Sequence, residues 1–220
     1  YKRQGVVNAA MKSGKKSICA GPGNPPVIVD DTVDLNKAAA DIIAGGAFDN
    51  NLLCVGEKEV FVFESVIDKF MDALKANGAV KICSNALDKL TREVFENKNG
   101  HYALKRALVG KDPQVLAEAA GTSVGSAAKM LFAQTDANHP FVIEEQMMPM
   151  LPIVAVRNFD EALAAAMKAE HNYRHSAIIH SHDVTRMSAS ARMLNTTVFV
   201  KNGPSTAGLG LGGEGYLSYS

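Results

Sequence analysis

Strand-like and helix-like segments alternate along this chain, and that alternation constrains its fold more than any other feature. Runs rich in valine, isoleucine and phenylalanine predict buried strands at 26–30, 59–64, 130–134, 141–143, 152–156, 176–181 and 197–201. Segments with a helical spacing of apolar residues fall between them, at 34–48, 65–78, 84–96, 112–121, 160–169 and 183–194. This order is typical of an α/β domain with a largely parallel sheet flanked by helices. Because no internal repeat or linker is visible, we expect residues 1–220 to form one domain.

Three of the predicted helices carry recognisable start signals. Asp34 opens the first, and Ser65 is expected to cap the second, which Gly78 ends. Asp112, followed by a proline, is typical of the first turn of the helix at 112–121. These polar residues set helix boundaries that the apolar pattern alone leaves open.

Composition excludes several classes of function. Hydrophobic residues make up 47% of the chain and charged residues 21%, the ordinary mix of a chain that buries a core. The formal net charge is zero and no basic block is present, so we expect neither a nucleic-acid nor a membrane partner. No signal-peptide pattern opens the sequence. The three cysteines are too scattered for a disulfide framework or a zinc site, which favours a reducing, cytoplasmic location.

Cys54 lies in an unusual place for a residue that only packs. The stretch GGAFDNNLLCVGEKEVFV puts it between the predicted helix at 34–48 and the predicted strand at 59–64. A lone cysteine is commonly an inert small hydrophobe. Loops at strand ends, however, often carry function. On local grounds Cys54 is therefore either filler or a nucleophile.

Two glycine-rich stretches are candidate functional loops. In GLGLGGEG, Gly208, Gly210 and Gly213 match a dinucleotide-binding spacing, but no room is left before Ser220 for the helix and strand that such a loop requires. A glycine loop that lets another group approach the backbone is favoured instead. The second stretch, AGPGNPP, is a rigid turn before a strand and is either a simple turn or a pocket wall.

Histidines and paired acids supply weaker candidates. His171 and His175 are four residues apart, a spacing that could bind metal on a helix, but no acidic third ligand follows suitably, so we expect no metal. Glu144 and Glu145 follow a predicted strand. Neighbouring residues of an extended chain point to opposite faces, so at most one of these glutamates faces a site.

Four motifs in order resemble the catalytic domain of the aldehyde dehydrogenases: AGPGNPPVIVD, DNNLLCVGEKEVFV, HPFVIEEQMMPMLP and FVKNGPSTAGLGLGGEG. Together they span essentially the whole chain. Within that superfamily they are similar to the coenzyme A-acylating branch, the propionaldehyde and acetaldehyde dehydrogenases of propanediol and ethanolamine utilisation. The resemblance implies a catalytic domain from a longer homo-oligomeric protein, in the cytoplasm or a bacterial microcompartment. Since the nucleotide-binding domain is expected mostly before residue 1, we expect this chain alone to bind NAD weakly and to be weakly active.

The resemblance also implies a reaction. The Cys54 thiolate attacks the carbonyl of a short-chain aldehyde, and the resulting thiohemiacetal gives a hydride to NAD. The acyl thioester left on Cys54 passes to the thiol of coenzyme A. The oxyanion is expected to bind the backbone N–H of Cys54 and an asparagine upstream of this chain.

One departure from the hydrolytic members of the superfamily bears on the acyl acceptor. Their glutamate general base is replaced here by Ala20, which cannot accept a proton. Water, with a pKa of about 15.7, needs a strong base or a metal. A thiol, with a pKa of about 8.5, is already partly ionised at neutral pH. Ala20 therefore favours transfer to coenzyme A over hydrolysis.

The other site positions rest on the resemblance alone. Glu145 matches a glutamate that binds the nicotinamide-side ribose, and Met147 matches a position beside the nicotinamide. His175 is predicted to be a polar group near the acyl or coenzyme A site. The residues expected to line the aldehyde pocket are Leu53, Val55, Asn202, Gly203 and Pro204.

Two other functions are compatible with these residues. An acyl-phosphate reductase would use the same cysteine thioester and would also lack the glutamate base. A non-catalytic module, kept for assembly into an oligomer or a microcompartment, would carry an unreactive Cys54. Testing coenzyme A esters against acyl phosphates separates the two enzymes, and thiol reactivity separates both from the module.

Overall fold

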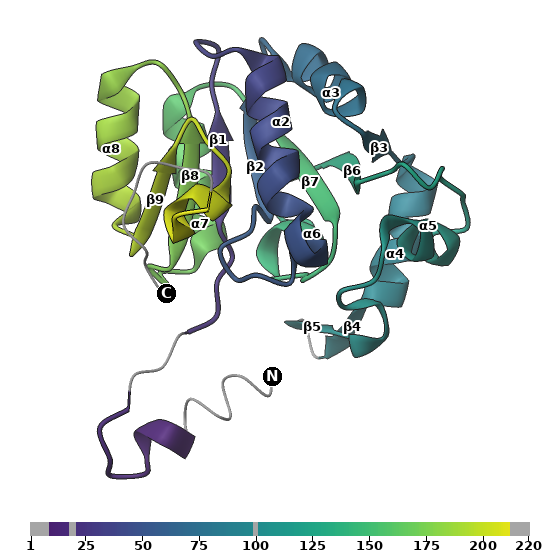
Figure 1. The fold of residues 1–220 in the computed structure, drawn as a ribbon, viewed down its shortest axis with the longest axis horizontal. Coiled ribbons are helices and arrows are strands. Elements are labelled where there is room, and N and C mark those ends of the chain that lie inside the picture. The colour runs from purple at the N-terminus through teal and green to yellow at the C-terminus, as the bar shows by residue number, and fades with distance from the viewer. Residues whose placement is uncertain (1–8, 18–20, 99–100, 212–220) are drawn as a thin grey trace.

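A seven-stranded sheet forms the body of the computed structural model, which describes residues 9–17, 21–98 and 101–211 (Figure 1). The strand order is β3-β6-β7-β2-β1-β8-β9, and each neighbouring pair runs parallel. The strands are β1 (Pro26–Val29), β2 (Glu59–Phe63), β3 (Ala79–Lys81), β6 (Met130–Thr135), β7 (Met150–Val156), β8 (Ser176–His180) and β9 (Val198–Lys201). This architecture confirms the predicted α/β class.

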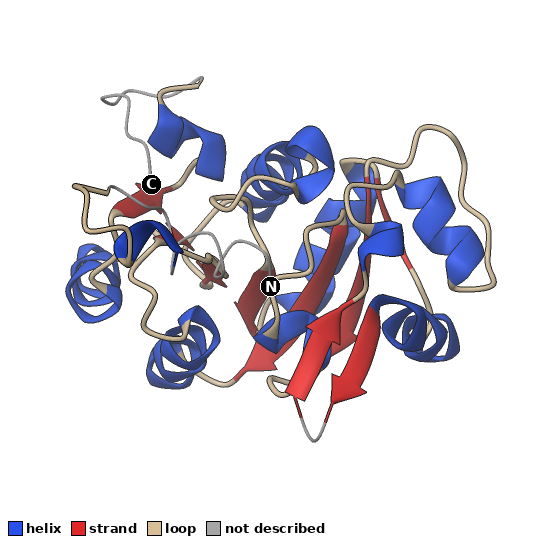
Figure 2. Ribbon diagram, turned by 90° about the horizontal axis from the view of Figure 1, so that it is seen from below, coloured by secondary structure: helices blue, strands red, loops and turns tan. Residues whose placement is uncertain are grey.

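Helices cover both faces of the sheet (Figure 2). They are α2 (Leu35–Gly46), α3 (Ile67–Ala76), α4 (Ser84–Val94), α5 (Pro113–Ala119), α6 (Pro140–Ile143), α7 (Phe159–Glu170) and α8 (Val184–Leu194). Short 3-10 helices are η1 (Phe48–Asn51), η2 (Arg106–Leu108) and η3 (Ser205–Leu209). A separate antiparallel hairpin pairs β4 (Phe95–Lys98) with β5 (His101–Leu104).

The central strands are apolar on both sides because both sides are covered. In β1, Val27 and Val29 pack with α2 and α3, whereas Ile28 packs with α7 and α8. Strand β2 repeats this division, with Val60 on the first face and Phe61 on the second. Parallel sheets buried on both faces have such continuous apolar strands.

Most predicted elements are confirmed, with ends shifted by a few residues. Asp34 caps α2 as predicted, and its carboxylate accepts hydrogen bonds from the backbone N–H groups of Asn36 and Lys37 at 2.9 and 3.1 Å. The strand predicted at 141–143 is wrong, because Pro140 and His139 begin the short helix α6 there: the His139 ring nitrogen Nδ1 accepts from the backbone N–H of Phe141 at 3.2 Å. Proline is well suited to a first helical turn.

Two predicted caps do not form, and three strands were not predicted. Ser65 does not cap α3, whose N-cap position is Val66. Asp112 stands at the N-cap position of α5 without capping it, and its carboxylate instead accepts a hydrogen bond from Nδ2 of Asn50 at 2.8 Å. The strands that the apolar pattern missed are β3, β4 and β5, each of three or four residues.

Candidate active site

Cys54 lies at the amino-terminal edge of the sheet, in the loop that joins η1 to β2. The three residues before this loop's turn, Asp49, Asn50 and Asn51, all have left-handed backbone angles, with φ of 48°, 50° and 59°. Asparagine and aspartate adopt this conformation more readily than other non-glycine residues. The sequence FDNN therefore turns the chain sharply after α2 and presents Cys54, which is half-buried, just ahead of β2.

A pair of buried polar residues closes the loop around Cys54. The Lys58 ammonium donates to the main-chain oxygen of Asn51 and to its side-chain Oδ1, both at 2.7 Å. In return, Nδ2 of Asn51 donates to the main-chain oxygen of Glu57 at 2.8 Å. Residues 51–58 thus form a closed loop with Cys54 near its middle.

Glu57 ties this loop to the segment after β9. Its carboxylate accepts the backbone N–H of Ser205 at 2.8 Å and the Ser205 hydroxyl at 2.7 Å. The backbone of Gly45 in α2 lies against the same carboxylate, where a side chain would collide. Burial raises the pKa of Glu57 to about 7, although the Ser205 hydrogen bonds oppose that rise.

The glycine turn before β1 lies between Cys54 and His175. A Cβ atom on Gly23 would come within 2.6 Å of the Cys54 carbonyl oxygen and 3.0 Å of Nδ1 of His175. The His175 ring is buried, and its Nδ1 pairs with the Ser176 hydroxyl at 2.8 Å. The structure therefore brings the Cys54 main chain and the His175 ring together at this turn.

Glu145 and Glu144 have different surroundings. Glu145 is buried and its charge acts on the Lys58 ammonium, whereas Glu144 is half-buried. Next to them, Gln146 donates its Nε2 to the main-chain oxygens of Lys58 at 2.8 Å and Met150 at 3.0 Å. This segment therefore reaches the base of the Cys54 loop.

The remaining predicted site residues divide between the two edges of the sheet. Val55 is buried and Leu53 half-buried, both in the Cys54 loop. Met147 is half-buried with a φ of 47°, and its carbonyl oxygen accepts the backbone N–H of Gly110 at 3.0 Å. Their roles remain predictions.

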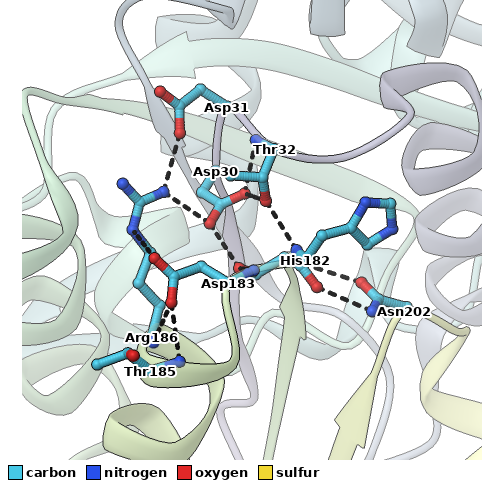
Figure 3. A network of polar contacts seen from close by, with 9 residues as sticks. Asp30, Asp31, Thr32, His182, Asp183, Thr185, Arg186 and Asn202 are labelled. Atoms are coloured by element: carbon cyan, nitrogen blue, oxygen red, sulfur yellow. Dashed lines mark hydrogen bonds and ion pairs between the residues drawn. The ribbon is translucent and has the colours of Figure 1, made fainter.

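Asn202 lies at the opposite edge from Cys54. It follows the carboxyl end of β9, and its amide group pairs with both main-chain groups of Ser181 at 2.9 Å (Figure 3). Gly203 and Pro204, both half-buried, lead from there to Ser205, which is the residue that meets the Cys54 loop through Glu57. The structure does not bring the Asn202 side chain to Cys54.

The charged residues beside Cys54 were not predicted as part of the site. Lys58 and Glu59 are fully buried, and neither carboxylate oxygen of Glu59 has a hydrogen-bond partner among the residues that the structure describes. Burial raises the pKa of Glu59 well above its usual value. Burial also lowers the pKa of Lys58 to about 8, against the opposing charges of Glu145, Cys54, Glu59 and Glu57. In the sequence, three charged residues run directly into an unbroken apolar strand, and that abrupt change was the available signal.

Some predictions concern parts that the structure does not describe. Ala20 and Gly213 fall outside the described ranges. Among residues 9–17, 21–98 and 101–211, no group of three or more histidine, cysteine or acidic side chains is placed to hold a metal ion. Within the same ranges, no helix is both long and apolar enough to cross a bilayer.

An α/β domain that presents a cysteine on a tightly held loop, beside a histidine and buried carboxylates, has the arrangement of an enzyme with a thiol nucleophile. The chain belongs to the aldehyde dehydrogenase family, whose family model matches residues 3–215. This membership confirms the resemblance that the four sequence motifs carry.

Comparison with individual proteins gives closer likenesses. A CoA-propanoylating propanal dehydrogenase of Salmonella typhimurium is 47% identical over 217 residues, which are 98% of this chain and 46% of that protein. An acetylating acetaldehyde dehydrogenase of Escherichia coli is 43% identical over 218 residues, 98% of this chain and 47% of that protein. The chain thus spans about half the length of these relatives.

Solved structures agree with these relatives. The propionaldehyde dehydrogenase of Rhodopseudomonas palustris with bound propionyl-CoA superposes with a TM-score of 0.93 and 44% identity, covering 98% of this chain and 47% of that one. The same enzyme is known with bound CoA and an acylated cysteine, at the same TM-score. A propionaldehyde dehydrogenase from a fucose utilisation bacterial microcompartment of Clostridium phytofermentans gives 0.92 and 43%, with coverages of 98% and 49%.

Proposed function

We propose that the protein oxidises a short-chain aldehyde, propanal or acetaldehyde, to its acyl-CoA with reduction of NAD, and that Cys54 carries the acyl group. The observation that carries the proposal is the placement of Cys54 on a loop closed by Lys58 and set against His175. The 47% identity to a CoA-propanoylating dehydrogenase supports the choice of acceptor. Because the chain spans about half of such relatives, the complete reaction is proposed for the full-length protein.

The reaction begins and ends at the sulfur of Cys54. Its thiolate adds to the aldehyde carbonyl, which forms a C–S bond and places the negative charge on oxygen. Collapse of that oxyanion expels a hydride from the carbon and leaves an acyl thioester on Cys54. The sulfur of coenzyme A then attacks the thioester, and Cys54 departs as thiolate. The thiol proton of coenzyme A must go to a base. The proposed base is the imidazole ring of His175, which lies beside the Cys54 main chain.

NAD supplies the hydride acceptor when bound. Glu145 fits a ribose-binding role, since a buried carboxylate is a strong acceptor for hydroxyl groups and this one reaches the base of the Cys54 loop. Met147 is proposed to contact the nicotinamide side. A related engineered glycolyl-CoA reductase has been solved with bound NADP+, which is consistent with a nicotinamide cofactor in this branch.

The location and the assembly of the protein are proposed from its relatives alone. A relative solved at a TM-score of 0.92 comes from a bacterial microcompartment. We therefore propose a homo-oligomer that works in the cytoplasm or within such a compartment, with small aldehydes and coenzyme A as its partners.

Intact mass measurement after mixing the chain with propionyl-CoA tests the acyl-carrier role, because reverse transfer needs no nicotinamide. We expect one added propionyl group on the wild type and none on Cys54→Ala. Excess free coenzyme A should remove the group again. An adduct that persists in Cys54→Ala, or that appears equally with propionyl phosphate, would contradict the proposal and would favour another residue or the acyl-phosphate reductase.

A further inference from the structure

Lys58 is a fully buried ammonium to which the reaction described above gives no role. Its side chain has no exposed area, although lysine is among the residues least often buried completely. Burial of a charged amine is unfavourable unless hydrogen bonds and opposite charges compensate for the lost water. The contacts of this ammonium therefore indicate which part of the structure it stabilises.

Both hydrogen bonds that the Lys58 ammonium donates to described residues end on one residue. The acceptors are the main-chain oxygen and Oδ1 of Asn51, each at 2.7 Å. Asn51 has a left-handed φ of 59° and is the last of three consecutive non-glycine residues in that conformation. A chain path of this kind persists only when the surrounding contacts hold it. Lys58 is thus the contact that fixes the first residue of the Cys54 loop.

Gly56 shows how closely the loop is fitted around this contact. A Cβ atom on Gly56 would lie 2.5 Å from Oδ1 of Asn51, the same oxygen that binds Lys58. The side-chain nitrogen Nδ2 of Asn51 donates to the main-chain oxygen of Glu57 at 2.8 Å. In the sequence, Cys54 lies between the two residues that close the loop, three residues after Asn51 and four before Lys58.

The charges around the ammonium come from more than one element. Glu145 acts on it from the segment before β7, and Glu57, Glu59 and Cys54 act on it from its own segment. The Gln146 amide holds the main-chain oxygen of Lys58 at 2.8 Å and so fixes the residue from the β7 side. The ammonium is therefore placed where it contacts the loop and also lies within the field of the nucleophile.

We propose that Lys58 is the positioning residue for the nucleophile: by binding both oxygens of Asn51, its ammonium holds the 51–58 loop in the form that presents the Cys54 thiol to its substrate. The part of this inference that concerns acyl transfer rests on the proposed function, whereas the part that concerns the loop does not. A loop that is not held would present the thiol in many orientations, and misplacement of a reacting atom by about 1 Å can reduce a rate roughly a hundredfold.

The test compares Lys58→Met, Lys58→Arg and the control Lys75→Met, a change at an exposed lysine paired with Asp72. Two rates are measured on Cys54 in each chain: alkylation by iodoacetamide and acylation by propionyl-CoA. Exposed Cys83 in the same chain serves as the reference thiol. We expect Lys58→Met to slow both Cys54 rates at least tenfold without changing Cys83. Lys58→Arg should restore most of the rate, and Lys75→Met should change nothing.

A pH profile gives a readout that a merely structural role would not move. The pKa of Lys58 is about 8, so the wild-type ammonium loses its charge above that pH. The ratio of the Cys54 rate to the Cys83 rate should therefore fall through pH 8 in the wild type. It should stay level in Lys58→Arg, because arginine remains charged in this range. A level ratio in the folded wild type overturns the proposal.

The outcomes separate this proposal from the function on which it partly rests. If propionyl-CoA fails to acylate the wild type while alkylation still depends on Lys58, the proposed function fails and the positioning role stands. If acylation succeeds and neither rate depends on Lys58, the reverse holds. Should Lys58→Met not fold, Gly56→Ala, which displaces Oδ1 of Asn51, and the wild-type pH profile decide the question: unchanged rates in Gly56→Ala would refute the positioning role.

Discussion

The two ends of the parallel strands, which form the carboxyl edge and the amino edge of the sheet, differ in how their buried charges are paired. At the carboxyl edge, Arg186 donates to Asp30 and to Asp31, both at 2.8 Å, and the Ser181 hydroxyl donates to Asp30 at 2.6 Å (Figure 3). Burial alone would raise the pKa of Asp30, but the hydrogen bonds from Ser181, Thr32 and Arg186 hold it below its usual value. The charges of Asp30, Asp31 and Arg186 are therefore paired at this edge.

At the amino edge the charges are crowded and less completely matched. Within the described part of the chain, neither carboxylate oxygen of Glu59 has a hydrogen bond, and burial raises its pKa well above normal. Glu57 and Lys58 also have pKa values displaced toward neutrality, because both are fully buried. Residues with strongly perturbed pKa values cluster at the active sites of enzymes. From this comparison we infer that the carboxyl edge serves stability, whereas the amino edge is the candidate reactive site.

This division reverses a familiar expectation. In open α/β sheets, ligands usually bind outside the carboxyl ends of the strands. Here the loops that meet at Cys54 precede the strands: Gly23 precedes β1, Cys54 precedes β2 and His175 precedes β8. A site search guided by strand direction alone would have chosen the Arg186 network instead.

The largest expected effect is at the amino edge. Replacing the nucleophile in Cys54→Ala should abolish acylation by propionyl-CoA, because no other group described beside it can carry a thioester. The melting temperature should not fall, since Cys54 is half-buried and its side chain has no hydrogen bond to any residue that the structure describes. Intact mass and a thermal melt of the same sample check both expectations, and retained acylation would break the comparison outright.

Gly23→Ala should come next in size. The added methyl group would lie 2.6 Å from the Cys54 carbonyl oxygen, so the loop or the turn must shift. We expect acylation of Cys54 to slow roughly a hundredfold, the loss that a displacement of about 1 Å can cause. Gly125→Ala is the matched control, because a Cβ atom there meets nothing within 4 Å. Equal rates for the two variants would show that the turn does not position the site.

Arg186→Met probes the opposite edge. It leaves Asp30 fully buried without its cationic partner, and breaking a buried pair on one side commonly costs about 3 kcal/mol. We expect a loss of that order in the free energy of unfolding, measured by urea titration, with unchanged Cys54 alkylation in the folded chain. A slowed thiol in this variant would mean that the two edges are coupled rather than separate.

Glu59→Gln should give the smallest effect, one that depends on pH. The pKa of Glu59 is raised in the folded chain, so its protonated form supports the fold at low pH and that support is lost as pH rises above the unfolded value. The glutamine variant has no proton to lose. Its melting temperature should exceed that of the wild type at pH 8 by about 3 °C, a shift typical of ~1 kcal/mol in a chain of this size. At pH 4.5 the two should melt together, and a constant difference across this range would argue against a protonated Glu59.

Much of the fold could be predicted from the sequence because its strands are continuous apolar runs. The run at 26–30 became β1, since a strand covered on both faces has no polar alternation to obscure it. The error at 141–143 arose because three apolar residues are too short to distinguish a strand from a helix. There the proline and histidine just before the run decided the outcome.

The candidate site was predictable only in part. Family motifs pointed to Cys54, Glu145 and His175, and the structure places the last of these against the turn that touches Cys54. Lys58 was overlooked because GEKE has the composition of a solvated turn. Its burial depends on residues distant in sequence, such as Gln146, whose side chain binds the Lys58 main chain. No local pattern encodes such a neighbour.

The wide spacing of these neighbours along the chain has a kinetic consequence. Asn24, one residue from Gly23, donates its side-chain amide to the carbonyl of Ala169, 145 residues away, and β1 must pair with both β2 and β8. Contacts of such high sequence separation close slowly during folding. We therefore expect the surroundings of Cys54 to be completed among the last steps of refolding. The time at which this thiol acquires its native alkylation rate would report the arrival of the final topology, later than the helical signal of circular dichroism.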